Sequence, residues 1–150
     1  MKNQNIVFVA MASVLAFALG PVTKANISPE DVQRPIITIH SAGNVLRGKT
    51  GSFVLKMSPT VALGGLYVSF KVSGTAVAGV DYVSLLSPAY IGQSGYEVIS
   101  LRTLPDPRGS SDQKAYSVVV TLEPGAGYAV GEPSSALIWI STSCVLEACW

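Results

Sequence analysis

The amino-acid sequence predicts an all-β fold built from antiparallel sheets that pack face to face. Three observations lead to this prediction. Beyond residue 35, the 150-residue chain consists of short runs rich in β-branched and aromatic residues. Gly, Pro, Asn and Ser separate these runs at intervals of roughly 8–15 residues, as between the strands of a β-protein. Apolar and polar residues alternate within most runs, which is the pattern of a strand with one buried and one solvent-facing side.

The first 25 residues have the features of a secretory signal peptide. Lys2 gives a positive start, residues 6–20 form an uncharged apolar run, and Pro21 interrupts it just before a small-residue cleavage site at Ala25. The apolar run is shorter than the roughly 20 residues that span a bilayer, which favours a cleaved signal over a retained anchor. We therefore expect a mature chain from Asn26 that is secreted, periplasmic or displayed at the cell surface, with no membrane span.

An extended lead-in and seven strands are expected to follow. Residues 26–35 are polar and carry two prolines, which predicts an extended lead-in. The predicted strands are 36–40, 51–57, 65–72, 81–86, 96–104, 116–122 and 135–141. Seven strands in about 115 residues match an immunoglobulin-like antiparallel β-sandwich in size and strand count. A small barrel is the alternative architecture.

The alternation within the runs predicts which side chains face the core. The first run, IITIH, is β-branched and ends at the turn-like Ser-Ala-Gly-Asn. In 96–104 the phase is blurred, because Ile99 and Leu101 compete with Val98 and Leu104 for the inward positions. The other alternating runs predict these inward residues: Phe53, Leu55, Met57, Leu66, Val68, Phe70, Val72, Tyr116, Val118, Val120, Leu122, Ala136, Ile138 and Ile140.

The charge balance argues against nucleic acid as a partner. The whole chain has a formal net charge of +1, and removal of residues 1–25 would take away Lys2 and Lys24. Such a balance creates no basic surface for nucleic acid or anionic lipid. Arg34, Arg47 and Lys49 form a thin basic group around the first turn, which we interpret as a solvated face.

Two cysteines, Cys144 and Cys149, lie in the predicted tail 142–150. Without a second pair, a four-ligand zinc site cannot form, and the C-x4-C spacing is not that of a redox motif. In an exported chain we expect a local disulfide between them. A free or intermolecular thiol is the alternative.

Catalytic constellations are missing from the sequence. His40 is the single histidine, and no G-x-S-x-G motif occurs, so a Ser-His-Asp triad is not indicated. Glu97, Glu123 and Glu132 could pair as glycosidase carboxylates in principle, but their positions suggest exposed strand ends and turns. We expect the protein not to be an enzyme.

The stretch GTAVAGVDY at residues 74–82 predicts a tight corner between two strands. Gly74 and Gly79 permit positive φ or close approach of another segment, and Ala76 leaves room for a neighbour. Asp81 can bond nearby backbone amides, and Tyr82 can bury its ring while its hydroxyl finds a partner.

This stretch resembles the signature of the Calx-beta domain, a calcium-associated immunoglobulin-like sandwich. In that family a strand leads into Gly-Thr-Ala, a small gap and Gly-x-Asp-Tyr. The matching positions are Gly74, Thr75, Ala76, Gly79, Asp81 and Tyr82. The resemblance covers roughly residues 36–141, with the flanks agreeing in pattern more than in identity. It implies a secreted or surface module for adhesion, matrix contact or calcium-dependent stiffening.

The resemblance also implies a calcium site. Asp81 matches one family ligand position, Asp106 falls near another, and Asp112 lies in the same loop. The other ligand positions carry neutral residues, and Arg108 and Lys114 add positive charge nearby. Calcium needs six to eight oxygens, so we expect weak calcium binding at most and no other cofactor. In the alternative case the site is degenerate and Asp81 serves as a loop-capping hydrogen bonder.

The sequence therefore predicts a non-catalytic binding or structural module that contacts a protein partner or self-associates at a sheet edge. One alternative is a subunit of a surface fibre, in which the lead-in and residues 36–39 add as a strand to a neighbour's sheet. Another is a carbohydrate-binding module with an exposed aromatic platform. The candidates for such a platform are Tyr67, Tyr90, Tyr96, Tyr128 and Trp139.

Overall fold

The computed structural model describes residues 34–61, 64–105 and 114–142. The strands within these ranges are β1 Ile36–Ser41, β2 Val45–Leu46, β3 Thr50–Ser58, β4 Leu66–Val68, β5 Phe70–Ser73, β6 Ala89–Ile91, β7 Tyr96–Arg102, β8 Tyr116–Leu122, β9 Ala129–Val130 and β10 Ser135–Ser141. The described residues include no helix that is long and apolar enough to cross a membrane. The predicted signal peptide, most of the lead-in and both cysteines lie outside the described residues, so these remain predictions.

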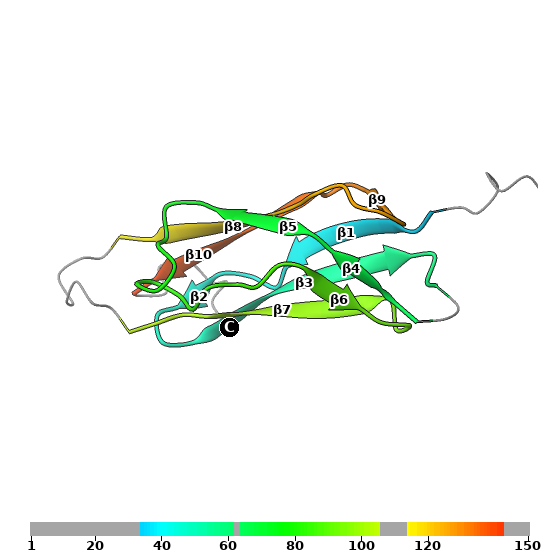
Figure 1. The fold of residues 1–150 in the computed structure, drawn as a ribbon. Coiled ribbons are helices and arrows are strands. Elements are labelled where there is room, and N and C mark those ends of the chain that lie inside the picture. The colour runs from blue at the N-terminus through cyan, green and yellow to red at the C-terminus, as the bar shows by residue number, and fades with distance from the viewer. Residues whose placement is uncertain (1–33, 62–63, 106–113, 143–150) are drawn as a thin grey trace, which may run out of the picture. The chain divides into compact units, whose positions relative to one another are not determined.

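The strands form two four-stranded sheets and one two-stranded sheet, and Figure 1 labels their members. One has the order β7-β3-β1-β9 and the other the order β2-β10-β8-β5, while β4 and β6 form a two-stranded sheet. Only Ser69 separates β4 from β5, so one continuous stretch of chain pairs first with β6 and then with β8. The predicted immunoglobulin-like β-sandwich is confirmed.

Backbone hydrogen bonds close one side of the sandwich. Most pairings are antiparallel, but β1 pairs with β9 and β10 pairs with β2 in parallel. Gly131 N–H donates to the Ile37 carbonyl (2.8 Å), and Ile39 N–H donates to the Pro133 carbonyl (3.1 Å). The chain thus passes from one sheet to the other between β1 and β2 and again between β9 and β10. This crossing leaves no open strand edge between β1 and the segment that leads into β10.

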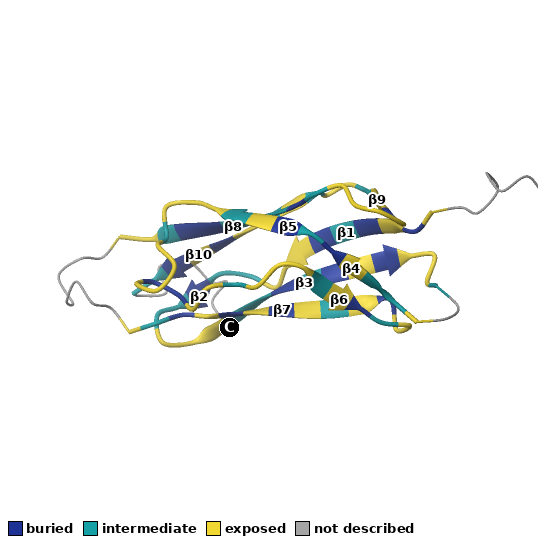
Figure 2. Ribbon diagram, viewed as in Figure 1, coloured by how far each residue is buried: buried dark blue, intermediate teal, exposed yellow. Residues whose placement is uncertain are grey.

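The core follows the predicted alternation. Among the described residues the fully buried side chains include Ile37, Ile39, Phe53, Leu55, Val68, Leu101, Val118, Val120, Ile138 and Ile140. Figure 2 shows buried positions, in dark blue, alternating with exposed ones along the strands. The blurred run of β7 resolves with Ile99 and Leu101 inside, whereas Val98 is 53% exposed. The outward phase of β10 is also as predicted, since Leu137 and Trp139 are exposed.

The predicted strand at 81–86 is wrong. Asp81 lies in a turn, Tyr82 forms only isolated β-bridges to Ala78 and Thr103, and residues 83–86 belong to no strand. The strand of this region is β6 at Ala89–Ile91. The apolar pattern of the run reflects two different environments, because Tyr82 packs into the core while Leu86 is 85% exposed.

Candidate functional site

The first half of the 74–82 corner is fastened to β8 through Ser117. Thr75 N–H donates to Ser117 Oγ (3.1 Å), and Ser117 N–H donates to Thr75 Oγ1 (2.9 Å). Ala76 N–H donates to the Ser117 carbonyl (3.0 Å). Gly74 has φ of 122°, and a Cβ there would collide with that same carbonyl. The Gly-Thr-Ala part of the motif is therefore the interface between the corner and the neighbouring strand.

The second half of the corner is a turn closed by Asp81. Asp81 N–H donates to the Val77 carbonyl (2.8 Å), while Val77 N–H donates to Asp81 Oδ2 (2.7 Å). Gly79, with φ of 81°, donates its N–H to the Tyr82 carbonyl (2.8 Å). The Asp81 carbonyl in turn accepts the N–H of Leu104 (2.9 Å), at the end of β7. The loop-capping role considered for Asp81 is present, and it joins the corner to the first sheet.

The second oxygen of Asp81 binds a guanidinium from a distant part of the chain. Arg47 Nη2 donates to Asp81 Oδ1 at 2.7 Å, with the Arg47 side chain 5% exposed and the Asp81 side chain fully buried. Arg47 Cζ also lies 5.2 Å from the centroid of the Tyr116 ring, at the start of β8. The buried charge of Asp81 is thus balanced by a buried cation, which is the arrangement that a carboxylate in a protein interior requires.

A hydrogen-bonded turn between β2 and β3 places the Arg47 side chain next to Asp81. Residues 46–49 connect β2 to β3 through a turn in which Lys49 N–H donates to the Leu46 carbonyl, and Gly48 has φ of 75°. Arg47 N–H donates to the Ser141 carbonyl (3.0 Å) of β10. Thr103 Oγ1 donates to the carbonyls of Leu46 (3.0 Å) and Lys49 (2.6 Å), which ties the turn to the chain after β7.

The interpretation of Arg34, Arg47 and Lys49 as one solvated basic face is therefore corrected for Arg47. Arg34 and Lys49 are exposed as expected. Arg47 is 34 positions from Asp81 in the chain, so nothing in its local sequence predicts the contact. The available signal was Asp81 itself, because an acid predicted to lie in a packed corner needs a cation or several donors near it.

The electrostatics of the corner extend to Tyr82. Burial raises the pKa of the Tyr82 phenol above its ordinary value of 10.0, and the negative charge of Asp81 raises it further. The Tyr82 ring is 5% exposed and belongs to the core. The phenol is therefore neutral over the whole physiological pH range, and it adds no second negative charge beside Asp81.

The described part of the corner does not offer calcium a suitable cage. Both Asp81 oxygens already bind other groups, Oδ1 the Arg47 guanidinium and Oδ2 the Val77 amide. No three His, Cys, Asp or Glu side chains gather within the ranges that the structure describes. The other two predicted ligands, Asp106 and Asp112, lie outside those ranges. Calcium at Asp81 would have to share this small space with the guanidinium, whose charge has the same sign.

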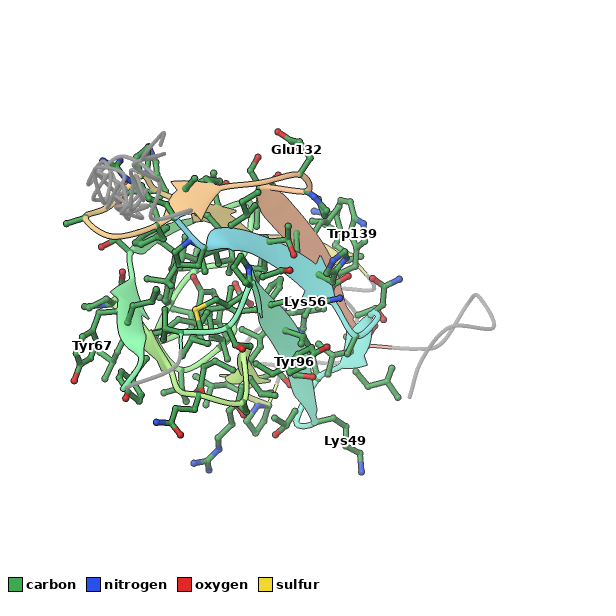
Figure 3. The ribbon with its side chains drawn as sticks, turned by 90° about the vertical axis from the view of Figure 1, so that its right-hand side faces the viewer. Lys49, Lys56, Tyr67, Tyr96, Glu132 and Trp139 are labelled. Atoms are coloured by element: carbon green, nitrogen blue, oxygen red, sulfur yellow. The ribbon has the colours of Figure 1, made fainter. Side chains whose placement is uncertain are left out.

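The candidate aromatic residues do not form one platform. Tyr67 of β4 and Tyr90 of β6 face each other, with ring centroids 5.1 Å apart and an interplanar angle of 53°. Tyr96 and Trp139 lie on other surfaces, and Figure 3 places Trp139 on the far side of the sandwich from Tyr67. Tyr128 is corrected from exposed to buried, because its hydroxyl donates to the Glu123 carbonyl and accepts the N–H of Ser69.

Comparison with known proteins supports the fold. No family model matches the chain, and no curated protein matches it. The crystal structure of the calcium binding domain CBD12 of CALX1.1 matches with a TM-score of 0.52 and 14% identity over 69% of this chain. The chain has the Calx-beta fold. It spans 43% of the length of that CALX1.1 chain, and at this identity the likeness establishes the fold alone.

Two further solved structures are similar at lower scores. The apo form of the Calx CBD1 domain matches with a TM-score of 0.48 and 15% identity, over 70% of this chain and 96% of that one. A CARDB domain from Pyrococcus furiosus, in complex with di-metal ions, matches with a TM-score of 0.43 and 15% identity, over 72% of this chain and 93% of that one. The calcium of the CALX1.1 domain and the metal ions of the CARDB domain are properties of those two proteins.

Proposed function

We propose that this chain is an exported, non-catalytic Calx-beta module that acts through surface contacts, with at most a weak contribution from calcium. The buried polar side chains of the described residues support this proposal. Asp81, Thr103 and Ser117 all bind structural partners within the fold, so their oxygens serve the architecture. His40 is exposed on β1, and its register partner on β3 is Val54, which offers no acid or nucleophile.

The contact surface that we propose is the aromatic pair of β4 and β6, and this is the observation that carries the function. Tyr67 is 66% exposed and Tyr90 is 47% exposed. Gly65 supports the arrangement, since a Cβ there would lie 2.8 Å from the Tyr90 hydroxyl, so the ring rests on bare backbone. Tyrosines of this kind supply large, rigid contact area at low entropic cost, and they are enriched at the energetic centres of protein interfaces. We infer a protein partner.

Site-specific photocrosslinking tests this proposal. A photoreactive phenylalanine analogue at position 67 should give an adduct with one protein of the extracellular fraction, whereas the same analogue at the exposed Tyr96 should not. The partner is then purified, and its affinity is measured by calorimetry. Loss of two exposed anchors in Tyr67→Ser/Tyr90→Ser should weaken binding by at least about tenfold, while Tyr96→Ser leaves it unchanged. Equal affinity of the wild type and both variants would refute the proposed surface.

A sugar ligand is the competing use of the same pair. Two rings inclined at 53° make a less suitable platform for a flat sugar face than coplanar rings would. A glycan array with the wild-type chain distinguishes the two. Binding to a glycan that is lost in Tyr67→Ser/Tyr90→Ser, with no protein adduct, would replace the protein partner by a carbohydrate.

Strand addition is the second candidate function, and the edge of β7 is the observation that favours it. Met57 N–H donates to the Gly95 carbonyl and Thr103 N–H to the Lys49 carbonyl, so the odd-numbered residues of β7 bond to β3. The N–H and C=O groups of Val98 and Ser100 consequently point away from β3, to the open edge of the sheet. No described residue bonds to them there. This edge is a template for another strand.

The open part of this edge is short because both of its ends are occupied. Ser94 Oγ accepts the N–H of Tyr96 (3.3 Å) and donates to its carbonyl (3.1 Å). At the other end, Val83 N–H donates to the Arg102 carbonyl (2.9 Å). The run 36–39, considered above as a donor strand, is already paired with β3 and β9 as part of β1. Antiparallel pairing of two copies through β7 is the assembly that fits this geometry.

Sedimentation velocity tests this second candidate. A dimer through β7 should dissociate in Val98→Lys, which places a charge on the paired edge, and should persist in Leu137→Lys, which places the same charge on an exposed position of β10. A wild-type chain that sediments as a monomer at high concentration would exclude the assembly.

A further inference from the structure

Asp81 carries a fully buried carboxylate in the corner that the structure describes. Its side chain is fully buried, and it contacts a backbone amide and a guanidinium at 2.7 Å each. A backbone amide alone does not compensate a carboxylate that has lost its hydration. Asp81 therefore needs a cation, and the question is which cation the fold provides.

The fold itself provides that cation through Arg47. The backbone of the turn that holds Arg47 is hydrogen-bonded to two other segments. Its partners are Ser141 of β10 and Thr103 after β7. Its guanidinium then lies between Asp81 and the face of the Tyr116 ring. Two residues remote in sequence, Asp81 and Tyr116, thus contact the side chain. Ser141 and Thr103 hold the backbone of the turn that carries it.

Two further nitrogen atoms of the guanidinium support the same assignment. Arg47 Nε and Nη1 are buried and have no hydrogen-bond partner among the residues that the structure describes. Buried donors without partners are costly, and they persist where another requirement outweighs the cost. Neutralisation of Asp81 is such a requirement, because an uncompensated carboxylate in this position would cost more than two unpaired donors.

We propose that Arg47 is the resident cation of the 74–82 corner and that Asp81 is consequently not a calcium ligand. The guanidinium supplies the positive charge that a bound calcium ion would supply, so the corner is rigid without metal. A divalent ion at Asp81 would face a cation of like charge in direct contact with the same carboxylate. The inference deepens the proposed function by removing calcium from this corner, and it leaves the Tyr67 and Tyr90 contact surface independent of metal.

Metal titration of the wild-type chain is the first test. The melting temperature should be the same in excess EDTA and in millimolar CaCl2, and Tb³⁺ should give no luminescence sensitised by the nearby Tyr82. A rise of several degrees in calcium that Asp81→Asn abolishes would overturn the proposal. A calcium response that Asp81→Asn retains would support it, since the ion would then bind elsewhere. None of these outcomes bears on the crosslinking at position 67.

A double-variant cycle is the second test. Arg47→Met should lower the melting temperature in EDTA by more than about 10 °C, since it removes the cation that contacts the buried carboxylate of Asp81. Arg47→Met/Asp81→Asn should melt higher than Arg47→Met alone, because removing the second charge removes the penalty. Arg47→Lys should recover part of the loss, and Lys49→Met, in the same turn but exposed, should change nothing.

The cycle also has outcomes that would refute the proposal. If Arg47→Met melts like the wild type in EDTA, the guanidinium is not needed to balance Asp81. If the double variant melts no higher than Arg47→Met, the loss comes from packing and not from charge. Should Arg47→Met fail to fold, the titration of the wild type and the melting temperature of Arg47→Lys still decide the matter.

Discussion

Thr75 and Ser117 each bind the other's backbone amide, although 42 positions separate them in the chain. The two side-chain oxygens lie 3.2 Å apart, so the four groups form one closed hydrogen-bonded pair between the corner and β8. Arg47 and Asp81 close the other half of the same corner. The motif that carries the family resemblance is thus a structural junction whose polar groups are directed at each other.

We expect Ser117→Ala to destabilise the fold by about 1–3 kcal/mol, because it leaves the Thr75 amide without its acceptor and Thr75 Oγ1 without its hydroxyl partner. Ser117 is 8% exposed, so water cannot readily replace the lost bonds. Urea denaturation measures the change, and Ser100→Ala on the exposed face of β7 is the matched control. A value for Ser117→Ala no larger than that of the control would contradict the junction.

The two motif glycines should differ in their tolerance of alanine. Gly74→Ala meets both a φ of 122° and a collision with the Ser117 carbonyl, whereas Gly79→Ala meets a φ of 81° in open space. Gly79→Ala should cost about 1 kcal/mol for the left-handed conformation. Gly74→Ala should cost severalfold more, since β8 would have to move. Thermal denaturation of the two variants side by side gives the comparison, and similar melting temperatures would show that the close approach is not required.

Stability should fall in alkali through Tyr82. Its folded-state pKa is raised above 10.0 by burial and then by Asp81, so the folded protein holds the phenolic proton more tightly than the unfolded chain does. The associated stability is fully present below about pH 10 and is lost as pH rises from there through the folded pKa. Urea denaturation across this range should show the wild type losing stability relative to Tyr82→Phe. The exposed Tyr67→Phe variant should follow the wild type, and parallel curves for all three would exclude the effect.

Tyr128→Phe should lower stability by about 1–3 kcal/mol without changing the core. The hydroxyl donates to the Glu123 carbonyl at 2.7 Å and accepts the Ser69 amide at 3.1 Å, at the point where β4 passes into β5. The ring itself is 3% exposed and stays in place in phenylalanine. Hydrogen exchange should show faster opening of the Ser69 amide in this variant. Tyr96→Phe is the control, and an unchanged Ser69 amide in Tyr128→Phe would rule out the role given to the hydroxyl.

Local sequence predicted much of the sandwich because strand alternation is a local property. Residues two positions apart face the same side of a strand, so apolar positions such as Phe53 and Leu55 identify the inner face without knowledge of any neighbour. The glycines at 74 and 79 were recognisable for a similar reason, since a backbone requirement limits the residue type at a single position.

The prediction failed where one stretch of chain serves two environments. Asp81 and Tyr82 are buried at the end of the corner, and Leu86, only a few positions on, is exposed. An alternating pattern over 81–86 cannot distinguish this arrangement from a strand. The local sequence likewise does not predict the interruption at Ser69, where one strand changes partners. The Ser69 amide binds the Tyr128 hydroxyl, nearly sixty positions away in the chain.

The sequence by itself determined the fold class, the inner faces of most strands and the position of the corner, since each follows from spacing along the chain or from the conformational freedom of single residues. Only the tertiary structure decided what the corner contains. In the sequence Arg47 resembles an ordinary surface cation. In the structure the turn that carries it is bonded to Ser141 and Thr103. Its burial and its pairing with Asp81 then arise together, because a buried charge is stable only where the fold brings the opposite charge to it.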